Sequence, residues 1–273
     1  MNDTITRRVR SYAGLTLFSL FAIFPVVYVF LLALQTNSEA AAIPPTIIPA
    51  TPQFSNFGVV ASRIPLGQYF ANSMIFAVST TAAVLLTSLF AAYATTKLKM
   101  PGRQLIISFF VGGILIPPAI RSIPLYTLIA RMQLVDTWAG LSLPMMATGF
   151  GLFFMHQYLK SVPASVVEAA RIDGSSEIRI VLQIIAPVAA PALVTLLVYN
   201  FLFRWNGYLW PLVVTRRAWV TLPVGISVFK TSEQLITWNL VAAAAVVTLI
   251  PVIALFAALG GRIVKGIAMQ ASK

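Results

Sequence analysis

The sequence predicts an all-α integral membrane protein with six transmembrane helices and both termini in the cytoplasm. Of its 273 residues, 59% are hydrophobic and 10% are charged, whereas soluble domains carry about 25% charged residues. The apolar residues form six runs, each near the ~20 residues that a helix needs to cross ~30 Å of hydrocarbon. Helices are expected because a helix satisfies its own backbone hydrogen bonds in lipid, and the alternating ten-residue segments of a barrel are absent from the sequence.

The first predicted span is longer than the apolar part of a signal peptide and lacks a clear A-x-A cleavage site, so we expect it to be retained. The third ends at Pro117-Pro118, and a helical bundle tolerates the prolines that fall in or beside other spans. A short surface helix outside the membrane is expected between Arg121 and Asp136. The six spans are about 12–34, 71–96, 104–120, 138–158, 184–203 and 239–260.

The distribution of lysine and arginine sets the expected orientation, because cytoplasmic loops carry an excess of both. The side with the two termini holds twelve of the nineteen basic residues, the opposite side holds six, and Arg204 lies near a span end. The twelve are Arg7, Arg8, Arg10, Lys97, Lys99, Arg103, Lys160, Arg171, Arg179, Arg262, Lys265 and Lys273. The side with the termini is therefore predicted to be cytoplasmic. The net charge of +12 is explained by this topology, without a nucleic-acid partner.

The cytoplasmic loop between spans four and five concentrates acidic residues. Three of the seven in the chain, Glu168, Asp173 and Glu177, lie within about 161–183. One interpretation is an amphipathic helix on the lipid surface, but acidic residues are unfavourable on an anionic leaflet, and this helix is short and rich in small residues. The other is a helix that lies in a groove of a partner protein, where Glu168 pairs with a basic residue.

A sharp turn is predicted within this segment. Pro163 suits the first turn of one helix, and Gly174 suits the left-handed position just after its end. Ser175 or Ser176 can cap a second helix, which leads into span five. The segment is therefore expected to form a short helix, a glycine turn and another helix.

Sequence motifs in and around this segment are similar to those of a known family. "EAARIDG" followed by "APVAAP" resembles the EAA loop of ABC-importer permeases. It departs from the family pattern at Ala186, where leucine is usual, and at Val181, where an aromatic residue is common. The blocks "QLVDTWAGLSLP", "RWNGYLWPLVV" and "TLPVGISVF" extend the resemblance along the whole chain to carbohydrate importers of the maltose type, although Gly207 replaces the usual acid. The length and the proline-rich first outer loop resemble the shorter of the two permease subunits in such importers.

The resemblance implies a type I ABC-importer permease fold, with residues 1–273 forming one transmembrane domain. Its core is expected at about 68–262, between short cytoplasmic tails at 1–11 and 262–273. In this family the EAA loop docks into a cytoplasmic ATPase subunit, and the segment at about 161–183 takes that part here. The residues that match the coupling motif are Glu168, Ala169, Ala170, Asp173 and Gly174.

The resemblance also implies an assembly in a bacterial or archaeal inner membrane. Its expected partners are a second permease subunit in a heterodimer, two ATPase subunits and an extracytoplasmic substrate-binding protein. No G-x-x-x-x-G-K-[ST] loop is present, so ATP and magnesium are expected on the separate ATPase. The chain has no cysteine and one histidine, and we expect it to contain no cofactor, metal site or catalytic residue.

The implied function is to pass a sugar or oligosaccharide from the binding protein to the cytoplasm. A permease for glycerol-phosphate-type substrates is the alternative. An ion-coupled secondary transporter is disfavoured, because no ionisable residue lies in the middle of a predicted span. A membrane enzyme is disfavoured by the absence of H-E-x-x-H and G-x-S-x-G.

Four residues are candidates for the substrate path. Trp205 and Asn206 carry an aromatic face and an amide, which suit sugar rings and hydroxyls, while tryptophans near this loop also suit interfacial anchoring. Asn72 and Asn200 are polar residues in apolar runs, and they are equally well explained as hydrogen-bonding contacts between helices.

Two further polar residues are expected to have structural roles. Arg204, at the outer end of span five, is expected to extend its charged end to the membrane interface. His156 has no second ligand nearby in the sequence, so a packed or interfacial histidine is favoured over a metal ligand.

Overall fold

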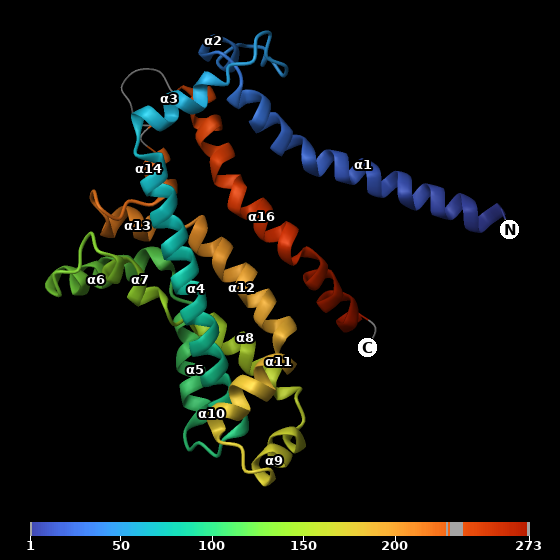
Figure 1. Ribbon diagram of the computed structural model, residues 1–273, viewed down its shortest axis with the longest axis vertical. Coiled ribbons are helices and arrows are strands. Elements are labelled where there is room, and N and C mark those ends of the chain that lie inside the picture. Colours follow the sequence, from blue (N-terminus) through green and yellow to red (C-terminus); the bar gives the residue numbers. More distant parts are fainter. Residues whose placement is uncertain (1, 228, 230–236, 272–273) are drawn as a thin grey trace. The chain divides into compact units, whose positions relative to one another are not determined.

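The computed structural model describes residues 2–227, 229 and 237–271, and their side chains between residues 10 and 260. Every regular element in this part of the chain is a helix (Figure 1). The chain divides into two compact units, one comprising Met1–Gly67 and Gly225–Ile250 and the other comprising Gln68–Val224 and Pro251–Lys273.

The first unit is held together by buried side-chain amides. It contains α1 (Asn2–Ala33), α2 (Asn37–Ala40), α3 (Ser55–Arg63) and the beginning of α16 (Trp238–Ala271). Asn56 Nδ2 donates to the carbonyl oxygens of Ala33 and Gln35, both at 2.9 Å, and Asn239 Nδ2 donates to Gln35 O at 3.2 Å. These bonds satisfy carbonyl groups that lack helical partners at the end of α1.

The second unit contains most of the remaining helices. They are α4 (Leu66–Lys97), α5 (Arg103–Ile114), α6 (Pro118–Arg131), α7 (Trp138–Ser142), η1 (Leu143–Met145), α8 (Gly149–Lys160), α9 (Ala164–Ile172), α10 (Glu177–Arg179), η2 (Ile180–Ile185), α11 (Ala186–Val188), α12 (Ala190–Trp205), α13 (Leu209–Val214) and α14 (Leu222–Ile226), the last of which reaches into the first unit. In Figure 1, α9 and α10 lie at one end of this unit, away from α6, α7 and α13.

The main core of the second unit lies between α4, α8, η2 and α12. Buried residues from these helices include Val84, Met155, Ile185 and Leu196. Gly149 allows α8 to approach α5 closely. A Cβ at this position would lie 2.4 Å from Phe110 O on α5, which is too close for any larger residue. A smaller cluster of buried side chains packs α4 against α6, α7 and α13. Its members are Phe76, Ile129, Leu141, Trp210 and Val214.

By length and composition, four helical segments of the described chain are long and apolar enough to cross a membrane, and two bent pairs bring the total to up to six spans. One of the four, at 138–160, is itself divided into α7, η1 and α8. The predicted spans 104–120 and 184–203 are not continuous helices. The chain bends by 104° between α5 and α6, and by 82° between α11 and α12. Prolines explain both breaks, since Pro117-Pro118 stands at the first, and Pro187 and Pro191 flank the second; proline removes a backbone donor and restricts the residue before it.

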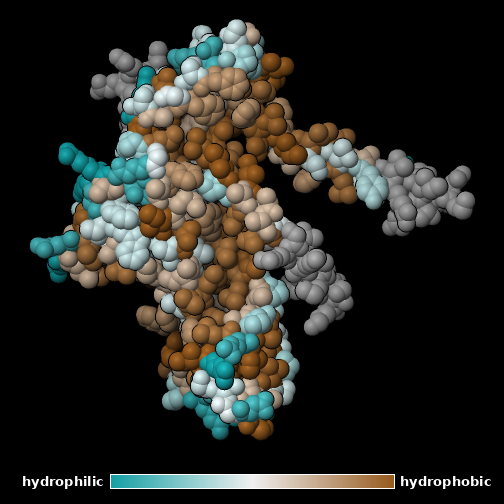
Figure 2. Space-filling model, in the orientation of Figure 1, coloured by the Kyte–Doolittle hydropathy of each residue, from teal (hydrophilic) through white to brown (hydrophobic). Residues whose placement is uncertain are grey.

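A short helix is present where the sequence predicted one after the third span, as α6. Figure 2 shows apolar side chains over much of the molecular face in view, including the middle of the second unit. Hydrophilic side chains gather near α6 and around α9 and α10. This distribution is typical of a chain that exposes its apolar belt to lipid or to a membrane partner.

Candidate functional site

The predicted coupling segment centres on α9, which has one buried face and one exposed face. Val167 and Ala170 are 2% and 5% exposed and pack into the core of the second unit. Glu168 and Ala169, by contrast, are exposed. Ala170 therefore anchors the helix to its own chain, and the surface open to a partner is formed by Glu168, Ala169 and the turn that follows.

This turn is a Schellman motif, as the sequence indicated. Gly174 has a φ of 77°, in the left-handed region. The Ser175 N–H donates to Ala170 O and the Gly174 N–H donates to Arg171 O, both at 3.0 Å, which satisfies two carbonyls at the end of α9. Ser176 occupies the N-cap position of α10, but its side chain makes no capping hydrogen bond.

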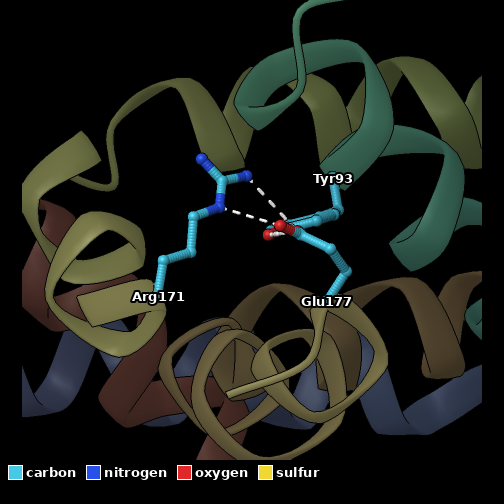
Figure 3. Close-up of polar contacts among 3 residues, drawn as sticks. All are labelled: Tyr93, Arg171 and Glu177. Carbon is cyan, nitrogen blue, oxygen red and sulfur yellow. Dashed lines mark hydrogen bonds and ion pairs between the residues drawn. The ribbon is translucent and has the colours of Figure 1, made fainter. Parts of the chain in front are cut away.

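A three-residue contact links the coupling segment to α4 (Figure 3). Arg171 Nε donates to Glu177 Oε1 at 2.8 Å and Arg171 Nη2 donates to Oε2 at 3.3 Å. The hydroxyl of Tyr93, on α4, donates to the same carboxylate. The hydrogen bond that Arg171 donates to Glu177 holds the pKa of Arg171 above its ordinary value. The sequence placed Glu177 in the acidic cytoplasmic loop, but no local pattern pointed to Tyr93, which is 84 residues away.

The exposed end of the segment combines acidic and apolar groups. Ile172 is 87% exposed, and Asp173 and Gly174 beside it are also exposed. Lys97 Nζ, at the end of α4, donates to Val162 O just before α9. The segment thus exposes the carboxylate of Glu168 on α9, and Ile172 and the carboxylate of Asp173 at the turn. Hydrogen bonds hold the segment on both sides of this surface, through Lys97 and through Glu177. Such a surface suits docking against a partner with a basic, partly apolar groove.

A second carboxylate, Asp136, organises the loop at 215–221. It accepts hydrogen bonds from the backbone N–H groups of Arg216, Arg217, Ala218 and Trp219, at 2.9 to 3.1 Å. Asp136 has a φ of 60°, a conformation that aspartate tolerates better than most residues. Burial alone would raise the pKa of Asp136, but the four N–H donors together hold it below its ordinary value. The sequence placed Asp136 in a loop without identifying this role.

The same loop also binds one of the candidate substrate-path residues. Asn72, which is buried, donates to the carbonyl oxygens of Ala218 at 2.9 Å and Val220 at 3.0 Å. The neighbouring Ser73 hydroxyl accepts from the Leu222 N–H at 2.7 Å. The amide of Asn72 is therefore occupied by the loop in this conformation, and its assignment to the substrate path remains a prediction.

The other three candidates lie on or just after α12. Asn200 is buried and donates to Thr81 Oγ1 at 3.1 Å, linking α12 to α4. Trp205 is 1% exposed, stacked on Phe201 with ring centroids 6.0 Å apart. Asn206 is exposed at the end of α12 and donates to Leu202 O at 2.9 Å. The structure thus leaves Asn206 accessible and places Asn200 and Trp205 within the packed helices; their part in the path stays a prediction.

The expectation for Arg204 is wrong. Its side chain does not extend to solvent but is only 9% exposed, with Nη1 and Nη2 placed 3.2 and 3.3 Å from Met145 Sδ and Met145 O. Met145, the last residue of η1, lies beside this end of α12, which sequence position alone did not indicate. His156 is packed as expected, with Nδ1 2.9 Å from Thr95 Oγ1.

No set of three or more potential metal ligands comes together among the described residues. The arrangement therefore consists of an exposed turn at one end of the second unit, a loop held by hydrogen bonds to Asp136 and Asn72, and a buried arginine on α12. None of these contains the paired nucleophile and base of a hydrolytic site. They are instead parts that can bind, hold and move.

Comparison with known proteins identifies the family to which a chain with these features is similar. Residues 7–269 match the family described as binding-protein-dependent transport system inner membrane component. The chain is 32% identical over 253 residues to the sn-glycerol-3-phosphate transport system permease protein UgpE of Escherichia coli O1:K1 / APEC, covering 90% of both chains. It is 33% identical over 240 residues to UgpE of Yersinia pestis bv. Antiqua (strain Antiqua), covering 85% of both.

A solved structure confirms the fold. A chain of a bacterial ABC transporter involved in the import of the acidic polysaccharide alginate superposes with a TM-score of 0.80, at 24% identity, over 96% of this chain and 97% of that one. The resemblance that began with the EAA motif is thereby confirmed along nearly the whole sequence. The chain belongs to the binding-protein-dependent transport system inner membrane components, and it is a multi-pass permease subunit of an ABC transporter of the inner membrane.

Proposed function

We propose that this permease passes a sugar or oligosaccharide from an extracytoplasmic binding protein to the cytoplasm, driven by ATP hydrolysis on a separate ATPase. The observation that carries the proposal is the geometry of α9 and its turn. Exposed Glu168, Ile172 and Asp173 form a surface for another protein, while Val167 and Ala170 tie the same helix into the core. A force applied to this surface is passed to the spans.

The Tyr93–Glu177–Arg171 contact is a second connection through which movement of α9 can reach the spans. Arg171 belongs to α9, Glu177 begins the broken span that leads to α12, and Tyr93 belongs to α4. When the docked turn moves, α4 and the α10–α12 segment are drawn along with it. A rigid-body movement of this kind alternates access to the two sides of the membrane. The bends of 104° and 82° divide the third and fifth spans into pieces that can move relative to one another.

The proposed assembly contains this chain, a second permease subunit, two ATPase subunits and a binding protein. ATP and magnesium bind on the ATPase subunits, and this chain holds no cofactor of its own. The excess of lysine and arginine on one side supports a cytoplasmic position for α9 and both termini. The loop at 215–221, on the opposite side, then faces the binding protein.

A second candidate substrate class is a glycerol-phosphate ester. It is favoured by the similarity to the two UgpE permeases, whose names specify sn-glycerol-3-phosphate transport. Both candidates are polyhydroxylated solutes that a binding protein delivers, so they share the same transport mechanism. They differ in charge, so the charge of the residues that surround the path distinguishes the two substrate classes.

The proposal is tested by coexpressing the chain with its companion subunits and measuring both ATPase copurification and solute uptake. Glu168→Lys is expected to weaken ATPase copurification and uptake at least 10-fold, because it reverses the charge at the docking surface. Ser62→Lys also introduces a lysine, at an exposed position on α3, and we expect it to leave both measurements unchanged. Normal assembly and uptake in Glu168→Lys would reject the docking role.

A further inference from the structure

Arg204 is a buried cation whose hydrogen-bonding capacity is only partly used. Its side chain lies at the C-terminal end of α12 and is 9% exposed. Its two described acceptors are Met145 Sδ at 3.2 Å and Met145 O at 3.3 Å, and Arg204 Nε has no hydrogen-bond partner. A thioether is a weak acceptor and the bond to the carbonyl is long. A guanidinium carries five N–H donors, so a better acceptor would compete successfully with Met145.

Positive charge accumulates around Arg204 instead of being neutralised. The charge of Arg121, on α6, has a small unfavourable electrostatic effect on that of Arg204. Gly207, three residues further on, offers no side chain. No carboxylate of the described side chains lies within 4.0 Å of Arg204, and the ion pair found among them is Arg171–Glu177. Asp136 is occupied by the four backbone N–H groups that it accepts. The second unit therefore contains a buried guanidinium group that no described carboxylate neutralises, and the charge of Arg121 adds to its positive potential.

Aromatic rings continue from this arginine along α12. The Arg204 Cζ atom lies 5.4 Å from the centroid of the Phe203 ring. Tyr199 stacks on Phe203 with centroids 6.1 Å apart, and Phe150 of α8 lies 4.5 Å from Tyr199. Tyr199 and Phe203 are about half exposed, at 46% and 53%. Aromatic surfaces beside a small number of polar groups are typical of sites for small organic ligands.

A structural role explains less of this geometry. A cation in the last turn of α12 interacts favourably with the helix dipole, but an exposed arginine would do so without losing its hydration. A buried charge is retained when it is paired or when it has a functional partner, and an ionisable residue in a membrane span is by default a candidate for the second case. Here the described residues supply no pair.

We propose that Arg204, assisted by Arg121, forms an anion subsite, so that the transported solute is a sugar or polyol bearing a carboxylate or a phosphate. This inference rests on the proposed transport function and specifies its substrate class. A guanidinium binds either oxyanion with two parallel hydrogen bonds, which Met145 cannot match. The adjoining rings of Tyr199 and Phe203 then contact the carbon skeleton of the solute.

The test uses the complete transporter, with its companion permease, ATPase subunits and binding protein, reconstituted in proteoliposomes. The probes are sn-glycerol-3-phosphate, an oligogalacturonate and neutral maltose. The wild-type transporter is expected to import one of the two anions in preference to maltose, and the anion chosen distinguishes phosphate from carboxylate. Arg204→Met and Arg204→Gln are expected to lower kcat/KM for that anion by about 10- to 100-fold, the effect of losing a hydrogen bond to a charged group.

Variants that differ in charge or position separate recognition from folding. Arg204→Lys keeps the charge but loses the planar guanidinium group, so its kcat/KM for the anion is expected to fall between the values for wild type and Arg204→Met. Arg121→Gln is expected to reduce anion import, whereas Arg131→Gln, at an exposed position on the same helix α6, is not. Thermal stability of Arg204→Met is expected to equal or exceed that of wild type, because an apolar residue replaces an unpaired buried charge.

Several results would overturn the subsite. These are preference for maltose, import of neither anion, unchanged anion import in Arg204→Met, or equal losses of anion import and of binding-protein-stimulated ATP hydrolysis in that variant. The last result would assign Arg204 to the fold alone. Failure of the proposed function looks different, because wild-type ATP hydrolysis would then show no stimulation by the binding protein with any probe.

Discussion

Asp136 and Glu177 are two carboxylates that join distant parts of the second unit, but they do so with different partners. Asp136 accepts from four main-chain N–H groups of one loop. Glu177 accepts from two side chains, those of Arg171 and Tyr93. Main-chain donors are fixed once the loop has its shape, whereas an arginine and a tyrosine can rotate away and return. The Asp136 contact is therefore suited to holding a surface in place, and the Glu177 contact is suited to a joint that moves.

The difference agrees with the place of each contact in the proposed transport cycle. The Asp136 loop, which Asn72 also fastens, is expected to meet the binding protein and should present one constant shape. The Glu177 contact lies behind the docking turn, where the ATPase is expected to drive movement. Four substitutions or conditions test this contrast, from the largest expected effect to the smallest.

Replacing Asp136 with alanine is expected to have the largest effect on stability. The change leaves four backbone donors without their acceptor, and water replaces it only in part, so we expect a loss of about 3 kcal/mol in unfolding free energy. Thermal unfolding of the purified complex measures this loss. Asp173→Ala, which removes an exposed carboxylate at the end of α9, is the control and should leave the melting temperature unchanged. Equal melting temperatures for both variants would show that the Asp136 contact does not hold the loop.

Lowering the pH is expected to weaken the same contact by a smaller amount, because a protonated carboxyl group still accepts hydrogen bonds. The pKa of Asp136 is lower in the folded protein than its ordinary value of 3.8. Its contribution to stability is therefore complete above pH 3.8 and is lost as the pH falls through the folded pKa. The stability difference between wild type and Asp136→Asn should be constant from pH 8 to about pH 5 and then shrink. A difference that grows on acidification would contradict this account.

Removing the Tyr93 hydroxyl is expected to cost about 1 kcal/mol of stability, the usual worth of one hydrogen bond. Its larger consequence should be on coupling, because Tyr93 joins α4 to Glu177. We expect Tyr93→Phe to transport less solute per ATP hydrolysed, measured by parallel uptake and phosphate-release assays. Tyr158→Phe removes another hydroxyl, which donates to Val188 O at 3.2 Å, and should keep the wild-type ratio. Unchanged coupling in Tyr93→Phe would remove this contact from the mechanism.

Replacing Gly174 with alanine should have the smallest and most local effect. A Cβ at this position meets nothing within 4 Å, so the cost is that of the left-handed backbone at a φ of 77°, about 1 kcal/mol. Amide hydrogen exchange should rise in α9 and α10 and remain constant elsewhere. Gly102→Ala carries a similar strain at a φ of 73° and is the control. A small decrease in ATPase copurification is expected for Gly174→Ala only.

The sequence by itself determined the helical membrane class, the family and the turn at Gly174. These features depend on composition, on long apolar runs and on the local conformational freedom of glycine, all of which are properties of the local sequence. The position of Glu168 on an exposed helical face followed from the same local pattern. The prolines were visible as well, but whether they end a span or bend it depends on how the flanking helices pack.

Only the tertiary structure decided which side chains meet. Tyr93 and Glu177 are in contact although they are 84 residues apart in the sequence, and Asp136 and Arg216 are in contact although they are 80 residues apart. The burial of Arg204 against Met145, 59 residues away on η1, likewise depends on tertiary packing. Such contacts arise from packing between helices, where any register along an apolar face satisfies the sequence pattern and shape complementarity selects one.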